Sequence, residues 1–501
     1  MAGKIMIQGT MSSAGKSFIV TGLCRIFSDL GYKVCPFKSQ NMALNSYVTK
    51  DGYEMGRAQV AQAEAAGVES DVRMNPILLK PTTDVGSQVI VMGKPVGNMK
   101  AAEYYEYKKS LIPVIKKAFS ELEEEYDIII VEGAGSPAEI NLRDNDIVNM
   151  GLAEMLDIPV LLAGDINLGG VFAQLLGTIE WLTESEKDRI KGLIINKFRG
   201  DVNLLKPGID MLEDRCGKKV IGVIPYSDAK IDEEDSVTRE LENGAVSGNE
   251  SLNRDDIVIA VIKLPHMSNF TDFAPLEMID GVLLKYVSSV SELSGMDIII
   301  VPGTKSTISD LKWLKENGLF NRINELAGNI PVMGICGGYQ MLGKMVLDPE
   351  HIEGEDLEEG FAFIDTKTVL VNEKTLKRTE GKISGLSGFF ECLNGTSFSG
   401  YEIHSGQTEG VTYNKENVFG TYVHGFFDKG EIVASLIDGL HNTRGARGNN
   451  KHSYDKAPKD IMDYSDIKNR EYDKAAKAIR ENIDLDYLFE IMGINKEKEE
   501  K

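Results

Sequence analysis

Two short stretches of this 501-residue chain carry residue types that could do chemistry. The first, GTMSSAGKS at residues 9–17, follows an apolar run and places glycines, hydroxyls and a lysine on one turn. Such a turn, with the start of the helix after it, binds phosphate through backbone N–H groups. The second, GICGGYQ at residues 334–340, places Cys336 between glycines. Together they predict a chain that activates a carboxylate with ATP and releases ammonia from glutamine.

The phosphate-binding turn assigns separate tasks to its side chains. Lys16 is expected to reach the outer phosphates of ATP, and Ser17 is expected to bind Mg²⁺. The other loop residues predicted to bind the nucleotide are Gly9, Thr10, Ser13 and Gly15. Gly9 lies one position further upstream than the usual spacing, and Thr10 takes the expected glycine position. A glycine-rich turn between a strand and a helix, with no ligand, is the alternative.

Three further polar residues lie at or just after the ends of predicted strands and belong to the same predicted site. Glu132 ends an apolar run and would supply a second Mg²⁺ ligand at the carboxyl edge of a sheet, unless it is a solvated glutamate. Lys38 could meet the transferred phosphate, with a lone surface lysine as the alternative. Asn196 is placed to recognise adenine through its amide, although an asparagine often simply terminates a strand.

The cysteine turn needs a base and an oxyanion site. A helix N-terminus after Cys336 would favour its thiolate, which makes it the nucleophile candidate; a structural cysteine buried in a glycine turn is the alternative. Among the six histidines, His424 after a predicted strand is the preferred base and His404 is the second choice. The backbone N–H groups of Gly303 and Gly337 are expected to hold the oxyanion.

The elements that position these residues alternate along the chain. Up to about residue 225, β-branched runs alternate with helical stretches, which predicts a mostly parallel sheet covered on both faces. The predicted strands are residues 4–8, 33–36, 89–92, 127–132, 159–163, 192–196 and 220–224, and the main helices are residues 55–66 and 101–124. A second alternating unit has predicted strands at residues 257–262, 281–287, 297–301, 331–335 and 418–422, and helices at residues 307–316 and 338–346.

The composition between and after these units suggests the domain boundaries. Residues 226–256 are crowded with Asp, Glu, Ser, Gly and Asn, which is typical of a linker. We therefore expect an ATP-dependent amidoligase domain over residues 1–225, the linker, a glutaminase domain over residues 257–443, and a tail over residues 444–501. The tail should contain a helix at residues 472–492 that packs on a neighbouring domain through Ala475, Ile479 and Ile483.

Bulk composition limits the partners and the compartment. A formal net charge of −22 with no basic cluster argues against nucleic acid, and no run of about 18 apolar residues predicts a membrane span. No export signal is evident, so we expect a cytoplasmic protein. Its five cysteines are scattered singly, which argues against a disulfide framework and a zinc site. The sequence leaves open whether the chain forms a homo-oligomer.

Longer strings around these residues resemble known families. The loop of residues 9–17 is similar to that of the dethiobiotin synthetase and MinD-like branch of P-loop proteins, and GICGGYQMLG is similar to the nucleophile turn of class I glutamine amidotransferases. Many of the latter carry a glutamate two residues after the histidine, where this chain has Phe426. The strings KSQNMALNS at residues 38–46, EGAGSPAEINL at residues 132–142, GGVFA at residues 169–173, PGTKST at residues 302–307 and GTYVHG at residues 420–425 resemble the cobyric acid synthase family of corrinoid amidotransferases.

That resemblance implies a fold and an activity. It implies an α/β protein, with a P-loop parallel-sheet domain followed by a class I glutamine amidotransferase domain. It implies amidation of the b, d, e and g carboxylates of adenosylcobyrinic acid a,c-diamide, using ATP, Mg²⁺ and L-glutamine, with no tightly bound prosthetic group. Asn41, Asp144, Asp146 and Asp165 are then candidates for binding substrate or metal, with turn and strand-end structural roles as the alternative for the aspartates.

Three other interpretations share part of this pattern. A cobyrinic acid a,c-diamide synthase would use the same two sites on other carboxylates, and the string at residues 38–46 favours the first interpretation. A MinD- or ParA-like ATPase switch would explain the phosphate loop, but it would leave the Cys336 turn unexplained. A module with a decayed glutaminase is disfavoured because Cys336 and His424 are both present.

Overall fold

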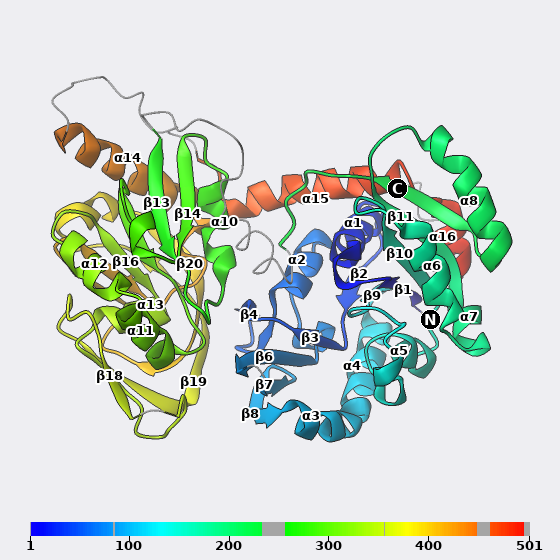
Figure 1. The fold of residues 1–501 in the computed structure, drawn as a ribbon, viewed down its shortest axis with the longest axis horizontal. Coiled ribbons are helices and arrows are strands. Elements are labelled where there is room, and N and C mark those ends of the chain that lie inside the picture. The colour runs from blue at the N-terminus through cyan, green and yellow to red at the C-terminus, as the bar shows by residue number, and fades with distance from the viewer. Residues whose placement is uncertain (1, 84–85, 233–255, 355, 448–460, 495–501) are drawn as a thin grey trace. The chain divides into compact units, whose positions relative to one another are not determined.

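The computed structural model describes residues 2–83, 86–232, 256–354, 356–447 and 461–494 (Figure 1). The chain forms two compact units, and each is built from separated segments. Unit 1 contains Met1–Ala43, Glu54–Glu234 and Lys468–Lys501, and unit 2 contains Leu44–Tyr53 and Asp235–Ile467. Most of the expected linker, residues 233–255, lies outside the described residues. Much of the expected tail belongs to unit 1.

The central sheet of unit 1 is wholly parallel. Its strand order is β12-β11-β10-β1-β9-β2. The strands are β1 (Gly3–Gly9), β2 (Val34–Phe37), β9 (Ile128–Glu132), β10 (Val160–Asp165), β11 (Ile190–Phe198) and β12 (Val220–Pro225). All six lie where the sequence predicts them. Their nearly continuous burial fits strands covered on both faces, and α1 and α6 pack against the sheet.

Helices of unit 1 precede, connect and flank these strands. They are η1 (Ser12–Ala14), α1 (Lys16–Asp29), α2 (Arg57–Ala65), η2 (Val72–Met74), α3 (Ala101–Tyr107), η3 (Lys108–Leu111), α4 (Ile112–Glu125), η4 (Ile140–Asn145), α5 (Met150–Met155), α6 (Val171–Glu180), α7 (Glu184–Arg189) and α8 (Val202–Cys216). The single helix predicted over residues 101–124 is wrong, because the chain forms α3, η3 and α4 there. Pro113 lies in the first turn of α4, where its missing N–H costs nothing, and this position favours a new helix start.

A small second sheet corrects one strand assignment. The run at residues 89–92 is part of β7 (Gly86–Val91), which lies outside the parallel sheet and pairs antiparallel with β6 (Ile77–Thr83) and β8 (Lys94–Lys100). Met92 and Gly93 between β7 and β8 both have positive φ, which is typical of a tight hairpin turn. Because a two-residue turn reverses the chain, β7 cannot join a parallel sheet with β8 as its neighbour. β3 (Gln40–Met42) completes this sheet, and β5 (Glu54–Gly56) lies nearby in sequence.

Two C-terminal helices complete the core of unit 1. The helix predicted over residues 472–492 is in fact two, α15 (Tyr464–Arg480) and α16 (Leu485–Met492), because Asp484 accepts a hydrogen bond from the Tyr487 N–H at 3.0 Å and begins the second. The predicted apolar stripe is buried, as Ala475 and Ile479 are fully inaccessible and pack on α1. The core of unit 1 is therefore completed by residues that follow all of unit 2 in the sequence.

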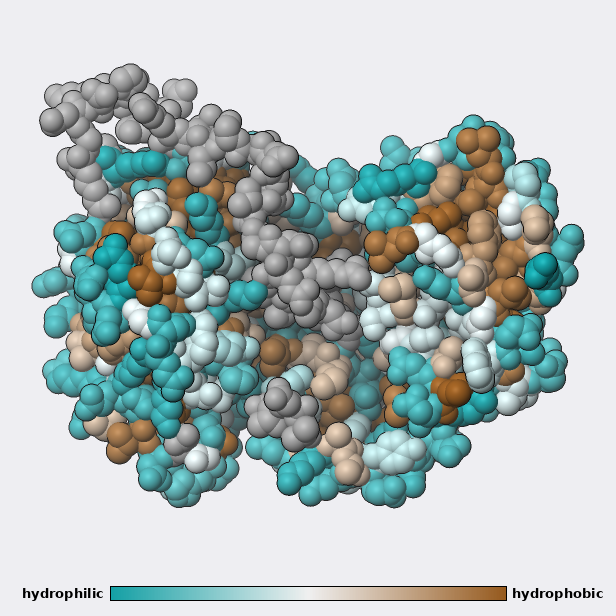
Figure 2. All heavy atoms as spheres, in the orientation of Figure 1, coloured by the Kyte–Doolittle hydropathy of each residue, from teal (hydrophilic) through white to brown (hydrophobic). Residues whose placement is uncertain are grey.

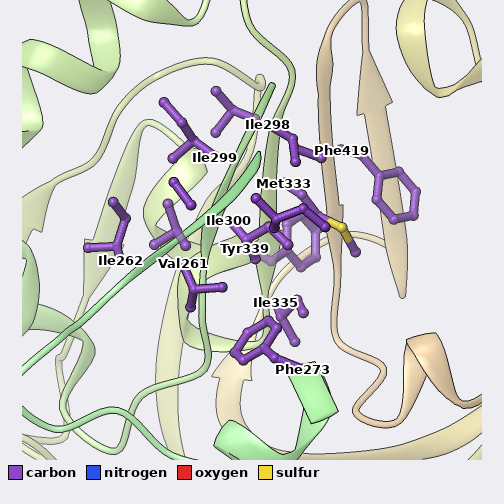
Figure 3. Packing of buried hydrophobic residues seen from close by; sticks show 14 of the residues in the cluster. Val261, Ile262, Phe273, Ile298, Ile299, Ile300, Met333, Ile335, Tyr339 and Phe419 are labelled. Carbon is purple, nitrogen blue, oxygen red and sulfur yellow. The ribbon is translucent and has the colours of Figure 1, made fainter. Parts of the chain in front are cut away.

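Unit 2 has its own sheet, with strand order β14-β13-β15-β16-β22-β21. Five parallel strands are β13 (Ile257–Ile262), β14 (Val282–Val287), β15 (Ile298–Val301), β16 (Val332–Ile335) and β22 (Val418–Thr421), and β21 (Thr412–Lys415) is antiparallel to β22. The five strands predicted for this unit are confirmed. Figure 3 shows the core that they share, with Ile300, Met333, Tyr339 and Phe419 gathered beside the strands.

The remaining elements of unit 2 surround that core. They are β4 (Ser46–Val48), η5 (Phe270–Phe273), α10 (Ala274–Glu277), η6 (Val290–Glu292), α11 (Thr307–Glu316), α12 (Leu319–Leu326), α13 (Gly337–Leu342), β17 (Met345–Leu347), β18 (Leu357–Glu359), β19 (Lys367–Lys382), η7 (Gly388–Leu393), β20 (Ser397–Gln407), η8 (Phe426–Asp428) and α14 (Gly430–Arg447). The helix predicted over residues 338–346 stops at Leu342, because Gly343 leaves the helical region with φ −69° and ψ −179° and strand β17 follows.

Helix α8 exposes several apolar side chains. Figure 2 shows apolar side chains over α8, and the large exposed ones on this helix are Val202, Leu204 and Met211, with Leu204 83% exposed. Clustered exposed apolar residues commonly mark interaction surfaces. Among the helices that the structure describes, none has the length and apolarity needed to cross a membrane.

Candidate active sites

The phosphate-binding loop of unit 1 joins β1 to α1. Gly15 has φ +90°, in the left-handed region, and α1 begins at Lys16 immediately after it. A Cβ on Gly9 would come within 2.9 Å of both the Met11 carbonyl oxygen and the Ala14 side chain, so the loop closes too tightly for a larger residue there. The loop is tied to the sheet because the Thr10 N–H donates to the Ala163 carbonyl at 2.9 Å. The predicted strand, turn and helix are all present.

The Lys16 side chain folds back over this loop. Its Nζ donates to the carbonyl oxygens of Met11, Ser12 and Gly135 at 3.0, 3.1 and 3.2 Å. Lys16 is almost completely buried. A buried ammonium at the start of a helix, folded over a turn between a strand and that helix, forms a site suited to phosphate oxygens.

Glu132 lies at the centre of the polar contacts beside the loop. Its Oε1 accepts from Ser17 Oγ at 2.9 Å and from Lys38 Nζ at 3.0 Å, and its Oε2 accepts from Gln62 Nε2. Burial opposes ionisation, but the Lys38 charge, the Gln62 hydrogen bond and Lys16 together hold the pKa of Glu132 below its usual value. Both Glu132 and Lys38 are buried, so the alternatives of a solvated glutamate and a surface lysine are wrong.

The hydroxyl of Ser17 and the carboxylate of Glu132 form an oxygen donor set that fits Mg²⁺. This ion prefers oxygen ligands and is usually held by one or two carboxylates together with substrate phosphates and water. In the part of the chain that the structure describes, no three His, Cys, Asp or Glu side chains are grouped to hold a metal. Two such oxygen donors would suit an ion that arrives with a nucleotide.

Asn196 lies against the loop, together with a lysine that the sequence did not single out. Asn196 Nδ2 donates to the Ala14 carbonyl at 2.9 Å, and the side chain is 1% exposed. Lys197 Nζ donates to the Ser13 carbonyl at 2.8 Å and pairs with Asp165 at 2.9 Å. Lys197 has φ +60°, which is uncommon for a side chain with a Cβ and was not detectable from sequence. Recognition of adenine by Asn196 stays a prediction.

The remaining substrate or metal candidates differ in their surroundings. Asp146 accepts from the backbone N–H groups of Val148, Asn149 and Gly151, so its carboxylate holds the start of α5. Asp165 is buried in its pair with Lys197 beside the phosphate loop.

Asn41 is buried and donates to Gln59 Oε1 at 2.8 Å, which leaves its own Oδ1 without a partner. Asp144 is exposed on η4. The structure gives the aspartates separate places and does not bring them together.

In unit 2, Cys336 lies on the sharp turn that the sequence predicts. It has φ +50°, follows β16 directly and immediately precedes α13, with only 5% of its surface exposed. Its Sγ lies 3.7 Å from the Ile403 carbonyl oxygen. Close packing requires the glycines around it, because a Cβ on Gly338 would approach the Val301 carbonyl oxygen to 1.9 Å. This is the strained strand-to-helix turn on which a nucleophile is presented.

His424 is paired with a carboxylate that sequence reasoning missed. Its Nδ1 lies 2.7 Å from Oδ2 of Asp272, and Oδ1 of Asp272 accepts from the Gly425 N–H at 2.9 Å. Burial alone would lower the pKa of His424, but the Asp272 charge, the neighbouring Cys336 and their hydrogen bonds raise it to about 10. The expected carboxylate two residues after the histidine is replaced by Phe426, which is buried among aromatic rings.

His404, the second choice for the base, is engaged elsewhere. Its Nδ1 lies 2.7 Å from the Gly406 carbonyl oxygen and its Nε2 lies 3.2 Å from Glu402. The Glu402 carboxyl is buried, which opposes ionisation, but hydrogen bonds from His404, Thr379 and Lys377 lower its pKa to about 2. With both ring nitrogens occupied, His404 is poorly placed to accept a proton from Cys336, which favours His424.

The predicted oxyanion donors lie beside the triad-like group. A Cβ on Gly303 would come within 3.0 Å of the His424 ring, and one on Gly337 would come within 2.6 Å of the Thr304 side chain. The Gly303 carbonyl accepts from the Ser268 N–H, which fixes the loop after β15. Cys336, His424 and Asp272 with these glycines can perform nucleophilic attack on an amide, proton transfer and oxyanion binding.

Comparison with known proteins agrees with this arrangement of sites. Residues 5–237 match a CobQ/CobB/MinD/ParA nucleotide binding domain, and residues 258–432 match a CobB/CobQ-like glutamine amidotransferase domain. The chain is 50% identical to a cobyric acid synthase of Ruminiclostridium cellulolyticum over 98% of this chain and 97% of that protein. Cobyric acid synthases of Lachnoclostridium phytofermentans and a Thermoanaerobacter species are 48% and 47% identical, each over 98% of this chain and 99% of the relative. These full-length matches confirm the resemblance found in the sequence, and the chain belongs to the cobyric acid synthase family.

Proposed function

We propose that this protein uses ATP and glutamine to amidate the b, d, e and g carboxylates of adenosylcobyrinic acid a,c-diamide. Its family makes it an ATP-dependent glutamine amidotransferase of cobalamin biosynthesis. One observation carries the proposal: a single chain holds a phosphate loop with a buried carboxylate and lysines in unit 1, and a Cys336, His424 and Asp272 group in unit 2.

We assign glutamine hydrolysis to unit 2. The Cys336 thiolate attacks the side-chain amide carbon of glutamine, and the N–H groups of Gly303 and Gly337 stabilise the oxyanion. The His424 imidazolium gives its proton to the leaving nitrogen, and ammonia departs as the thioester forms. His424 then takes a proton from water, whose oxygen attacks the thioester and releases glutamate. Asp272 holds the Nδ1 proton and orients the ring throughout.

Carboxylate activation is assigned to unit 1. An oxygen of the corrinoid carboxylate attacks the γ-phosphorus of ATP, ADP leaves, and an acyl phosphate forms. Ammonia attacks the acyl carbon and expels phosphate, which yields the primary amide. Lys16 and Lys38 stabilise charge on the transferred phosphoryl group, and Ser17 and Glu132 would hold Mg²⁺, which shields the phosphate charge when bound. Asn41, Asp144 and Asp165 are the substrate candidates, and Asp146 supports α5.

The two activities belong to different parts of the chain. We place amidation in residues 1–225, closed by α15 and α16, and glutaminase activity in residues 257–443. We propose a cytoplasmic enzyme with small-molecule substrates only and without nucleic acid or membrane partners, consistent with the net charge of −22. The exposed apolar side chains of α8 support self-association as a homo-oligomer.

Mass spectrometry of the corrinoid product tests the substrate assignment. The protein is incubated with adenosylcobyrinic acid a,c-diamide, glutamine and MgATP. Each OH that is replaced by NH₂ lowers the mass of the product by the difference between the two groups, so the mass reports the number of amides formed. Amidation at all four of the b, d, e and g positions is expected. A parallel incubation uses cobyrinic acid in place of the a,c-diamide. Amidation of only its a and c groups, with the a,c-diamide left unchanged, would establish the a,c-diamide synthase instead. ATP hydrolysis with no glutaminase activity would favour an ATPase switch.

A further inference from the structure

The string KSQNMALNS, residues 38–46, is divided between the two units. Its first half is fixed in unit 1. There, Lys38 Nζ donates a hydrogen bond to Glu132, and Ser39 Oγ donates to the Ile147 carbonyl at 2.6 Å. From Leu44 onward the same string belongs to unit 2. Lys38 and Asn45 are seven positions apart, so a short covalent connection joins the nucleotide site to the body of the glutaminase unit.

The second half of the string is bound reciprocally to one loop of unit 2. Oδ1 of Asn45 accepts from the Phe270 N–H at 3.1 Å, and Oδ1 of Asn269 accepts from the Ser46 N–H at 3.0 Å. All of these side chains except Phe270 are buried. Asn269 has φ +52°, so the loop turns through the left-handed region at this contact.

That loop presents the carboxylate that orients the catalytic histidine. The Asp272 N–H donates to the Asn269 carbonyl at 3.0 Å. The Asp272 carboxylate in turn is hydrogen-bonded to His424, with Oδ2 lying 2.7 Å from Nδ1. The string also reaches His424 from a second direction. Tyr401 OH donates to the Ser46 carbonyl at 2.9 Å, and the Tyr401 ring stacks on the His424 ring with centroids 5.4 Å apart.

The contacts of the string would change when a nucleotide binds. Lys38 is paired with Glu132, and phosphate oxygens in the loop would compete for its ammonium group. At the other end, Nδ2 of Asn45 is buried without a hydrogen-bond partner. A buried donor of this kind disfavours the present arrangement relative to one in which it is satisfied. Both ends of the string are therefore sensitive to a small displacement.

We propose that Asn45 and Ser46 are positioning residues for Asp272 and His424, and that the string at residues 38–46 couples nucleotide binding to glutamine hydrolysis. This inference rests on the proposed function of the two sites. The coupling prevents ammonia release when no carboxylate is being activated. Binding at the phosphate loop shifts Lys38, and the string then moves the loop that Asn45 and Ser46 hold through Phe270 and Asn269. Asp272, on that loop, brings His424 into its productive orientation.

Two variants break the contact from opposite sides. Asn45→Ala removes the acceptor for the Phe270 N–H. Asn269→Gly removes the acceptor for the Ser46 N–H and keeps a residue that tolerates positive φ. The matched control is Asn414→Ala, which removes the oxygen of a half-buried asparagine that accepts from the Ser387 N–H at 2.7 Å elsewhere in unit 2.

The measurement is glutamate release with glutamine alone and with MgATP plus the a,c-diamide corrinoid. In the parent and in Asn414→Ala we expect the second condition to raise the rate about fivefold or more. In Asn45→Ala and Asn269→Gly this ratio should fall to about one, while ammonium chloride still supports amidation at close to the parental rate. The two variants should agree because they break one contact.

Each other result counts against the coupling. A parental ratio in both variants would show that the contact transmits nothing, even if the glutamine-only rate falls. A parent with no stimulation would refute the coupling itself. Loss of ammonia-dependent amidation in the variants would mean that residues 45 and 269 serve unit 1 instead. A parent that amidates no corrinoid carboxylate would instead refute the proposed function, which keeps the two failures distinct.

Discussion

Replacing Asp272 by asparagine tests how the glutaminase site works. The substitution keeps the side-chain volume, and the asparagine Oδ1 can still accept from the Gly425 N–H. The amide NH₂ must then face Nδ1 of His424, where the carboxylate oxygen lies 2.7 Å away in the parent. Because an NH₂ group donates, Nδ1 must accept, and the ring proton moves to Nε2. His424 then has no free nitrogen with which to accept a proton.

The size of the effect follows from the charge of the pair. The pKa of His424 is raised from 6.5 to about 10, which corresponds to roughly 5 kcal/mol in favour of the imidazolium. Among the interactions that raise the pKa of His424, the negative charge of Asp272 is the largest. Losing both this charge and the correct tautomer should lower glutamine-dependent kcat by roughly 10²- to 10⁴-fold.

The pH dependence should change in a defined direction. Because the folded pKa of His424 is raised, the stability that its pair with Asp272 contributes is fully present below about pH 6.5 and is lost as pH rises through about 10. The parent should keep its imidazolium across neutral pH. In Asp272→Asn the deprotonation of His424 should shift to lower pH, and NMR of the imidazole ring can follow it.

The assay compares glutamine with ammonium chloride as nitrogen source. Ammonia-dependent amidation should be unchanged in Asp272→Asn, since unit 1 is untouched. Asp356→Asn is the control, because it alters an exposed carboxylate 3.6 Å from His351 in the same unit. Glutamine-dependent turnover within about tenfold of the parent would refute the orienting role of Asp272, as would an equal loss with both nitrogen sources.

Three further substitutions test the roles of Cys336, Lys16 and the buried core of unit 1 one at a time. Cys336→Ala should lose glutamine-dependent amidation. Ammonium chloride should restore amidation, and more so toward alkaline pH, because more of the ammonium is then present as NH₃. Failure of ammonium chloride to restore amidation would contradict the separation of the two sites. Lys16→Ala should lose product from both nitrogen sources, because activation precedes attack, so normal ammonia-dependent turnover would be the contrary result. Ile479 is fully buried, so Ile479→Ala should lower the free energy of unfolding of unit 1 by about 2–5 kcal/mol, as measured by denaturant unfolding. Glutaminase activity should survive. An unchanged unfolding transition would argue against a packing role for Ile479.

The sequence was most informative where chemistry requires a local pattern. The turn before Lys16 and the glycines around Cys336 each form a continuous string whose backbone geometry is determined by neighbours, so both sites were predicted from short stretches. The parallel strands were found because burial on both faces produces uninterrupted apolar runs. Strand β7 was misplaced because an apolar run does not reveal which partner it pairs with.

Contacts between distant residues were not predictable in this way. Asp272 and His424 are 152 positions apart, and nothing around Asp272 distinguishes it from other surface-type aspartates in the sequence. The same holds for Gln62 on Glu132 and for Lys197, whose positive φ appears only in the folded backbone. The end of the predicted helix after Gly338 was missed because it depends on the extended conformation of Gly343.

The place of α15 and α16 has a consequence for how the chain folds as it is synthesised. Ile479, Ile483 and Phe489 belong to the same core as the first strand and helix, yet the ribosome makes them only after all of unit 2. The glutaminase unit can therefore fold while the amidoligase unit still lacks part of its interior. During that interval the apolar side of α1 is uncovered, so a chaperone that binds nascent chains should protect the amidoligase half for longer.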